Sequence, residues 1–274
     1  MSLLSFRLVF LINIAFMLPA CSEEVRPHEN STVLPKVISL NPCLDALLVE
    51  LAEPSQILSL SHYSFDVSSS SIDLTLTKEF RSSAGTVEEI IALHPDVVFL
   101  STLTPASKLA GIRDLGIRVE AFNSPRTVAE SIAQVRRFSS ILGRAEAGEV
   151  LVQKIDEALS LGNKKRLFSA VMWQPGGIVP DEGQLISELL KAGGFISTST
   201  SMGFGQGDSL GLEQILYNPP DVVFVAGSTR AQRHPSLGQL DVSVRQLDPS
   251  LIYCGGTTIP KVMTQLNEIY ESLL

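Results

Sequence analysis

The sequence predicts an α/β fold of two similar lobes, each built around a parallel sheet, joined by a helix. The main observation is a segment that occurs twice: residues 87–100 read VEEIIALHPDVVFL and residues 212–225 read LEQILYNPPDVVFV. Proline cannot continue a helix, so each copy predicts a helix, a break at Pro-Asp and then a strand. A strand that is apolar on both faces is typical of a parallel sheet covered by helices on both sides.

The two copies align without a gap at an offset of 125 positions (213 − 88). This spacing indicates two lobes rather than a solenoid, whose units are about 20–50 residues long. A chance match between common helix–strand patterns is the alternative interpretation. The glutamate shared as Glu88 and Glu213 argues against chance, because a surface carboxylate carries no packing information.

The size and charge of the chain limit its function. Its 274 residues favour two lobes, each of roughly 100–130 residues. The formal net charge is −8 and no basic stripe is present, so we expect no nucleic-acid binding. An acidic surface is compatible with steering towards a basic partner.

Residues 1–20 predict a secretory signal peptide. A basic residue precedes an apolar run that ends at Leu18, and the small residue Ala20 stands before Cys21. The apolar run is too short to span a membrane. Leu18 and Ala20 before Cys21 are similar to a bacterial lipobox, so either Cys21 is lipidated or the signal is simply cleaved. We expect residues 21–34 to form a flexible tether of an exported protein.

The N-terminal lobe is expected to span residues 35–143 and to alternate strands with helices. Asn41 and Pro42 are typical of a helix start, and Gly116 of a helix end. A long Ser/Asp-rich loop follows the second strand, and such loops are usually functional. The predicted strands are 36–40, 57–61, 96–101 and 118–122, the predicted helices include 42–51 and 105–115, and the loop is 62–82.

No Gly/Pro-rich linker separates the halves of the chain. Helical stretches at 127–142 and 145–161 occupy that position, so we expect a bridging helix at 144–162 and a C-terminal lobe at 163–274. The predicted elements of that lobe are a strand at 166–173, a helix at 184–192, a loop at 195–211, a last strand at 251–254 and a closing helix at 259–274.

Cys43 and Cys254 follow the first and the last predicted strand. Disulfides form in exported proteins, and a bridge between these two residues would join the lobes and restrict their motion. We expect instead two buried thiols that pack as small hydrophobic side chains.

One stretch resembles a catalytic motif. Residues 207–211 read GDSLG, which fits the nucleophile elbow G-x-S-x-G with Ser209 as nucleophile. No buried strand precedes it, and the downstream Asp-x-x-His of GDSL hydrolases is absent, because Ala231 stands three positions before His234. An exported serine hydrolase therefore remains the alternative function, and Asp208 or Ser209 is expected to cap a helix.

No other catalytic or metal site is predicted. No two histidines are spaced i, i+4, so a closed zinc site is not expected. Neither a phosphate loop nor a dinucleotide fingerprint is present, and we expect no resident cofactor.

Candidate ligand-binding residues lie at predicted loop edges. In open α/β sheets, ligands bind outside the carboxyl ends of the strands, so two facing lobes would form a cleft there. The expected lining consists of three aromatic residues and four polar or basic ones: Tyr63, Trp173, Phe204, His62, Arg81, Thr102 and Arg230.

The opening segment KVISLNPCLDALLVELA, both repeat copies and the helical link together resemble the periplasmic binding proteins for vitamin B12, ferric siderophores and haem. The resemblance covers roughly Pro35 to Leu274. It implies two Rossmann-like lobes with parallel sheets joined by a single long helix, a periplasmic binding protein and not an enzyme, and delivery of a ligand to an ABC permease and its ATPase. It also implies that Glu88 and Glu213 dock against permease arginines, where complementary charge fixes orientation. We expect a monomer.

The resemblance leaves the ligand open. Tyr63 matches a ligand-stacking tyrosine of the cobalamin binder, but the tryptophan which that protein carries before its first repeat is absent here. Aromatic walls favour a large planar ligand, whereas Arg81 and Arg230 favour an anionic siderophore. His62 and Tyr63 could ligate haem iron. A ferric siderophore, a corrinoid and haem are the candidates, bound with a small hinge motion about the bridging helix.

Overall fold

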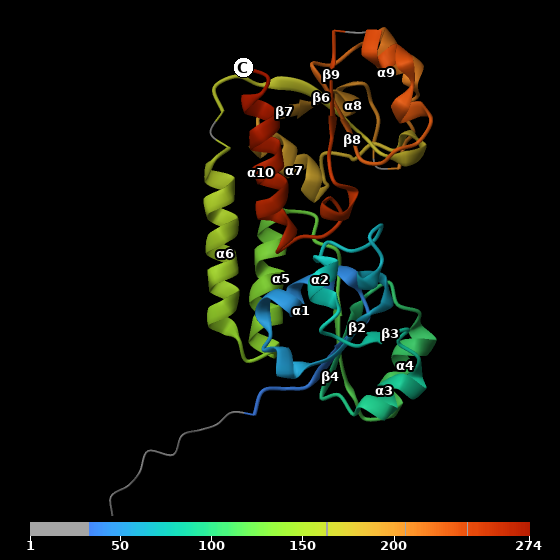
Figure 1. Cartoon of the computed structure of the whole chain (residues 1–274), viewed down its shortest axis with the longest axis vertical. Helices are drawn as coiled ribbons and strands as arrows, with labels where there is room; N and C mark the ends of the chain where they lie inside the picture. The colour runs from blue at the N-terminus through green and yellow to red at the C-terminus, as the bar shows by residue number, and fades with distance from the viewer. Residues whose placement is uncertain (1–32, 163, 206, 240) are drawn as a thin grey trace, which may run out of the picture. The chain divides into compact units, whose positions relative to one another are not determined.

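The computed structural model describes residues 33–162, 164–205, 207–239 and 241–274, and residues 34–274 form one compact unit (Figure 1). The predicted signal peptide, Cys21 and nearly all of the predicted tether lie outside the described residues. Within the described part of the chain, no helix is long and apolar enough to cross a membrane.

A five-stranded parallel sheet forms the first half, with strand order β3-β2-β1-β4-β5. Its strands are β1 (Val37–Ser39), β2 (Ile57–Ser61), β3 (Ser82–Ser83), β4 (Val97–Ser101) and β5 (Arg118–Phe122). Its helices are α1 (Pro42–Leu51), α2 (Leu74–Thr77), α3 (Val87–Leu93) and α4 (Ala106–Asp114), with 3₁₀ turns η1 (Pro54–Gln56) and η2 (His62–Phe65).

A four-stranded parallel sheet forms the second half, with strand order β7-β6-β8-β9. Its strands are β6 (Phe168–Trp173), β7 (Phe195–Ser197), β8 (Val222–Val225) and β9 (Ser243–Gln246). Its helices are α7 (Leu185–Ala192), α8 (Thr198–Ser201), α9 (Leu212–Tyr217) and α10 (Thr258–Glu271), with 3₁₀ turns η3 (Pro175–Gly177), η4 (Ala231–Arg233), η5 (Pro235–Gln239) and η6 (Pro249–Leu251).

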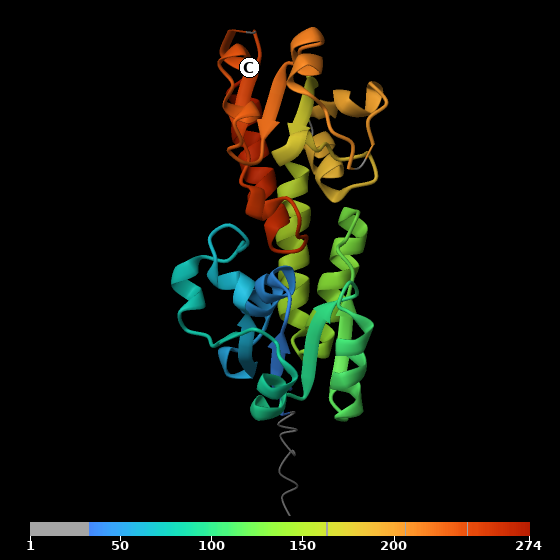
Figure 2. The same ribbon diagram turned by 90° about the vertical axis from the view of Figure 1, so that its right-hand side faces the viewer.

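Helices α5 (Val128–Ile141) and α6 (Ala145–Ser160) connect the two halves. Figure 1 and Figure 2 show α6 running from the half of the molecule that holds the first sheet to the half that holds the second, and it packs against α5 and α10. The predicted fold class, two Rossmann-like lobes with parallel sheets, is thereby confirmed. The predicted lobe boundaries, 35–143 and 163–274 with a link at 144–162, stay a prediction, because the whole of 34–274 forms one unit.

The central strands bury both of their faces. In β4, Val97 and Phe99 belong to a core cluster shared by both halves, whereas Val98 and Leu100 belong to a second cluster with Ile90 of α3. The strands β6 and β8 divide their side chains in the same way between the shared cluster and a third one. This alternation explains the continuous apolar runs of the sequence.

The repeated aspartate has a structural role. In the first copy, Asp96 Oδ2 accepts a 2.7 Å hydrogen bond from the main-chain N–H of Lys36, just before β1. In the second copy, Asp221 Oδ2 accepts an equivalent 2.7 Å bond from the N–H of Ser169 in β6. Each aspartate therefore fixes the strand next to its own, which gives both copies the same local structure.

Four predictions of local structure are wrong. The residue that precedes α9 as its cap is Gly211, and neither Asp208 nor Ser209 caps this helix. The segment 251–254 is not the last strand: that strand is β9, and residues 249–251 form the turn η6. The predicted loop 195–211 contains β7 and α8, and the predicted loop 62–82 contains η2 and α2.

The expectation of two free thiols is also wrong. Cys43 and Cys254 form a disulfide with an S–S distance of 2.03 Å and a Cα–Cα distance of 5.2 Å. Cys43 lies in the first turn of α1, which Asn41 caps, and this turn follows β1 directly. The bridge therefore ties the segment before α10 to the carboxyl end of β1.

Candidate functional site

The carboxyl ends of parallel strands lie at one edge of each sheet, and this edge is where open α/β sheets bind ligands. In the first sheet, His62 and Tyr63 follow β2 and Thr102 follows β4. In the second sheet, Gln174 follows β6. The disulfide brings the segment before α10 to the edge of the first sheet, since Cys43 begins the helix that follows β1.

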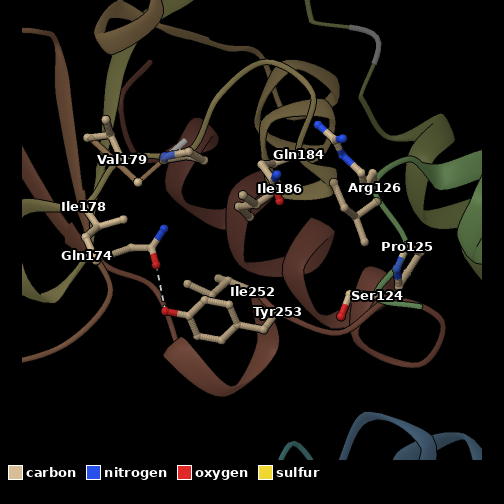
Figure 3. A pocket seen from close by; sticks show the side chains of 13 residues that line it. Ser124, Pro125, Arg126, Gln174, Ile178, Val179, Gln184, Ile186, Ile252 and Tyr253 are labelled. Atoms are coloured by element: carbon tan, nitrogen blue, oxygen red, sulfur yellow. Dashed lines mark hydrogen bonds between the residues drawn. The ribbon is translucent and has the colours of Figure 1, made fainter. Parts of the chain in front are cut away.

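A pocket of about 610 Å³ lies among these connections (Figure 3). Its walls come from three parts of the chain: the connection between β5 and α5, the segment that follows β6, including the start of α7, and the segment before α10. The lining residues are Ser124, Pro125, Arg126, Gln174, Ile178, Val179, Pro180, Gln184, Leu185, Ile186, Gly207, Ile252 and Tyr253. A largely apolar concave wall with a few polar groups is typical of a small-molecule site.

Tyr253 is the aromatic ring of this pocket. Its side chain is 57% exposed, and its Oη donates a 2.7 Å hydrogen bond to Gln174 Oε1, drawn in Figure 3. Partial burial raises the pKa of the Tyr253 phenol, so the ring is a neutral donor at physiological pH. The neighbouring Cys254 is in the disulfide, and Gly256 N donates a 2.7 Å bond to Ser131 Oγ of α5, which holds this segment in place.

Tyr63 is the exposed ring at the edge of the first sheet. It is 52% exposed and lies against His62, with ring centroids 4.0 Å apart. Asp45 of α1 holds the turn that carries both rings: its Oδ2 accepts hydrogen bonds from Ser61 N at 2.9 Å and Ser64 Oγ at 2.6 Å. The two donors lie on either side of His62 and Tyr63, so Asp45 fixes the backbone that presents them.

Asp45 is fully buried. Burial is the largest effect on its carboxyl group and raises the pKa to about 8, against the smaller lowering effect of hydrogen bonds from Ser39, Ser64 and Ser61.

Of the predicted aromatic residues, Trp173 is buried and Phe204 is partly buried. Trp173 is only 2% exposed, packs with Val171 in the third core cluster and donates a 2.9 Å hydrogen bond from Nε1 to Leu210 O. Phe204 is partly buried against the same cluster. The structure thus corrects the expectation for Trp173, because strand alternation places it on the covered face of β6.

The structure places the predicted polar residues Thr102, Arg81 and Arg230 on three separate connections. Thr102 lies at the carboxyl edge, where its hydroxyl donates to Asn123 Oδ1 of the neighbouring connection. Arg81 is exposed but precedes β3, on the amino side of that short strand. Arg230 is exposed on the connection after β8. Among the described residues, none of the seven predicted ligand residues lines the 610 Å³ pocket.

Among the described residues, no base is hydrogen-bonded to Ser209 that could activate it as a nucleophile. Its Oγ donates a 2.7 Å hydrogen bond to the Gly176 carbonyl. His234 accepts a bond at Nδ1 from Ser236 N. Within the part of the chain that the structure describes, no group of three or more His, Cys, Asp or Glu could hold a metal ion.

Glu88 and Glu213 are exposed, in the first turns of α3 and α9. A carboxylate at this position stabilises the positive end of the helix dipole, which gives each glutamate a local reason to be there. Because the two helices belong to different sheets, the two carboxylates stand one on each half of the molecule.

Comparison with known families gives a match over most of the chain. Residues 37–240 match the family described as periplasmic binding protein. The chain belongs to this family. As a periplasmic binding protein, it has the substrate-binding role of ABC transport and is located in the periplasm, and its family consists of binding proteins and not enzymes.

Solved structures show the same fold. A periplasmic haem binding protein from Pseudomonas aeruginosa is 18% identical, with a TM-score of 0.67 over 86% of this chain and 93% of that one. A periplasmic vitamin B12 binding protein of Vibrio cholerae is 17% identical, with a TM-score of 0.66 over 87% and 97%. A possible iron-binding protein from Staphylococcus epidermidis is 14% identical, with a TM-score of 0.67 over 87% and 98%. Comparison with curated proteins found no match.

Proposed function

We propose that this periplasmic binding protein captures a metal chelate, namely a ferric siderophore, a corrinoid or haem, between its two sheets and delivers it to an ABC permease. The observation that carries the proposal is a pair of exposed tyrosines at the carboxyl edges, Tyr63 at 52% and Tyr253 at 57% exposure. Exposed rings supply stacking surface for a large planar ligand, and a phenol oxygen is a known ligand of haem iron.

The connectivity supports a common site for the two rings. Tyr63 follows β2, and β2 pairs directly with β1. Tyr253 precedes Cys254, which is bonded to Cys43 at the start of the helix that follows β1. Both rings are therefore attached to neighbouring positions of one sheet edge, and the cavity of about 610 Å³ beside Tyr253 lies within the size range of small-molecule sites.

The second part of the proposal is docking of Glu88 and Glu213 on the permease. Both carboxylates are exposed and neither is in an ion pair within the described residues. They are thus available to arginines of a partner, and the net charge of −8 would favour approach to a basic surface. The proposal also includes attachment to the membrane through a lipidated Cys21.

A binding titration tests the proposal. The oxidised protein is titrated with haemin, with cyanocobalamin and with a ferric hydroxamate and a ferric catecholate siderophore, followed by visible absorbance and calorimetry. We expect one of these probes to bind, and Tyr63→Ala and Tyr253→Ala each to weaken it by roughly tenfold, the equivalent of about 1.4 kcal/mol for a lost aromatic contact. Tyr217→Ala is the matched control, because Tyr217 is 93% exposed on α9.

Phenylalanine variants separate stacking from metal ligation. If the phenol oxygen of Tyr63 or Tyr253 ligates iron, the Phe variant shifts the visible spectrum of bound haemin, whereas stacking alone leaves the spectrum unchanged. The proposal fails if none of the four probes binds the oxidised protein, or if Tyr217→Ala weakens binding as much as the two site variants do.

A further inference from the structure

Two arginines stand side by side on the connection after β8. Arg230 directly precedes the 3₁₀ turn η4, Ala231–Arg233, and Arg233 is the last residue of this turn, three positions further along the chain. A 3₁₀ helix has 3.0 residues per turn, so side chains at i and i+3 lie over one another. Both arginines are exposed. Two positive charges are thus held on the same side of one turn.

These charges have no acidic partner in the described part of the chain. The ion pairs found there involve other cations: Arg118, Arg126, Arg136, Arg137, Arg144, Lys154 and Lys164. Two like charges at close range repel each other. The arrangement is unusual in a protein of net charge −8, where carboxylates are in excess, and an anion would relieve the repulsion.

The turn is fixed to the site already described. Gln232 is only 4% exposed; its Nε2 donates a 2.8 Å hydrogen bond to Trp173 O, and its Oε1 accepts bonds from Thr229 N and Oγ1, both 2.9 Å. Trp173 is the last residue of β6, directly before Gln174 of the pocket. The buried amide therefore anchors the two arginines to the carboxyl edge of the second sheet.

A glycine brings the same connection close to the pocket loop. Gly227 has φ +141°, and a Cβ placed on it would lie 2.8 Å from Pro175 Cγ. Only glycine allows this approach without displacing Pro175, which is next to Gln174.

A hollow of about 380 Å³ lies beside the turn, lined by Arg230, Arg233, His234 and Pro235. His234 Nδ1 accepts a 3.2 Å hydrogen bond from Ser236 N, which leaves Nε2 as the ring nitrogen that can donate an N–H. The hollow thus offers two guanidinium groups and an imidazole N–H. Guanidinium groups bind carboxylate and phosphate with paired hydrogen bonds.

We propose that Arg230, Arg233 and His234 form an oxyanion subsite that binds a carboxylate or phosphate group at the periphery of the ligand. This inference rests on the proposed function, in which the ligand is a metal chelate. It adds that the chelate carries a negatively charged oxyanion group on the side that meets the second sheet. The subsite itself is a property of the turn and can be tested without the ligand.

The first test uses small anions. Arginine Nε–Hε resonances of ¹⁵N-labelled protein are followed during titration with citrate and, separately, with inorganic phosphate at constant ionic strength. The signals of Arg230 and Arg233, assigned from single Lys variants, are expected to shift and saturate together. The anion that saturates them at lower concentration identifies the oxyanion preferred. Arg113 of α4 is the internal control, because it is exposed and has no ion pair among the described residues.

The test variant carries both Arg230→Gln and Arg233→Gln, and the matched control carries Arg113→Gln alone. The double variant is expected to weaken citrate or phosphate binding at least tenfold, and Arg113→Gln to leave it unchanged. Non-saturating shifts of equal size at Arg113 and at Arg230 would overturn the subsite, because they would show only general screening of surface charge.

The second test compares haemin with haemin dimethyl ester, in which the two carboxylates are blocked. Where haemin binds, the double Gln variant is expected to lower its affinity at least tenfold and to leave the affinity of the ester unchanged. If citrate or phosphate saturates the site while no metal chelate binds, the proposed function fails and the subsite stands. If a chelate binds wild type and double variant equally and the anions do not saturate, the subsite fails and the proposed function stands.

Discussion

Removal of the Cys43–Cys254 disulfide is expected to destabilise the protein strongly. The bridge joins residues 211 positions apart in the sequence, which is most of the described chain. The variant is Cys43→Ser with Cys254→Ser, made together with Cys21→Ser so that no other cysteine remains. Serine keeps the size of the side chain, so the main change is the loss of the covalent link.

The magnitude follows from the length of the closed loop. For a loop of 211 residues, the chain-entropy relation predicts that removing the disulfide lowers the free energy of unfolding by about 5 kcal/mol at 25 °C. This is at the upper end of the 2–5 kcal/mol commonly measured on removing native disulfides. Contacts that remain without the bridge, such as the bond from Gly256 N to Ser131 Oγ, do not change this figure, because the entropy concerns the unfolded chain.

The assay is urea unfolding of Cys21→Ser protein, oxidised and reduced, and of the triple variant. Trp173 is the only tryptophan, and it is 2% exposed, so its fluorescence reports unfolding of the second half. Far-UV circular dichroism reports both halves, and coincident transitions would justify a two-state treatment. We expect reduction to lower the free energy of unfolding to that of the triple variant, and to leave the triple variant unchanged.

Two results would refute this reasoning. Thiol titration of denatured, unreduced Cys21→Ser protein that finds two free thiols would show that the bridge is absent. A triple variant within about 1 kcal/mol of the oxidised protein would show that the long loop is already restricted in the unfolded chain. The urea dependence gives an internal check, because an unfolded chain without the cross-link exposes more surface and should increase the slope m.

Three further predictions concern charge and motion. The folded-state pKa of Asp45 is about 8, above its ordinary value of 3.8, so the stability gained by proton binding is complete below pH 3.8 and is lost as the pH rises towards 8. Relative to Asp45→Asn, the free energy of unfolding of the wild type in urea should fall by up to about 1.4 kcal/mol per pH unit over this range. Wild type and variant with the same pH dependence of this free energy would contradict the prediction. The double variant Glu88→Ala with Glu213→Ala should keep its ligand affinity and reduce transport in vesicles that contain the permease, whereas Glu268→Ala, an exposed control on α10, should change neither. Loss of ligand binding in the double variant would show that the two glutamates serve ligand binding and not docking. Small-angle scattering should show only a small compaction on adding ligand to the oxidised protein, and a large one would show that the disulfide and α6 do not restrict closure.

The central strands could be predicted from the sequence, and the edge strands mostly could not. Strands β1, β4, β6 and β8 are buried on both faces, so their sequences are continuous apolar runs. The missed strands β3, β7 and β9 all lie at sheet edges. Edge strands such as Ser243–Gln246 bury less surface and carry polar side chains, so no apolar run marks them.

The error at β9 also hid Tyr253, the aromatic residue that lines the pocket. With the last strand placed at 251–254, Tyr253 appears to be inside a sheet, whereas a strand at 243–246 puts it in the connection at the carboxyl edge. Trp173 shows the opposite error. The alternation of side chains along a strand places Trp173 on the same face of β6 as Val171. The sequence did not reveal that Leu210, 37 positions later, packs over this face and accepts the hydrogen bond of the indole N–H.

Helix α1 links the two tyrosines of the proposed site. Asp45 holds the turn that carries Tyr63, and Cys43, two positions earlier on the same helix, is bonded to the residue after Tyr253. A movement of one sheet relative to the other would therefore strain the bridge at Cys43 before it separated the two rings. We therefore expect the proposed site to be formed before a ligand binds, so that binding costs less ordering of the protein. Reduction of the disulfide should accordingly weaken ligand binding mainly through faster dissociation, with Tyr63 still in place on its Asp45-bound turn.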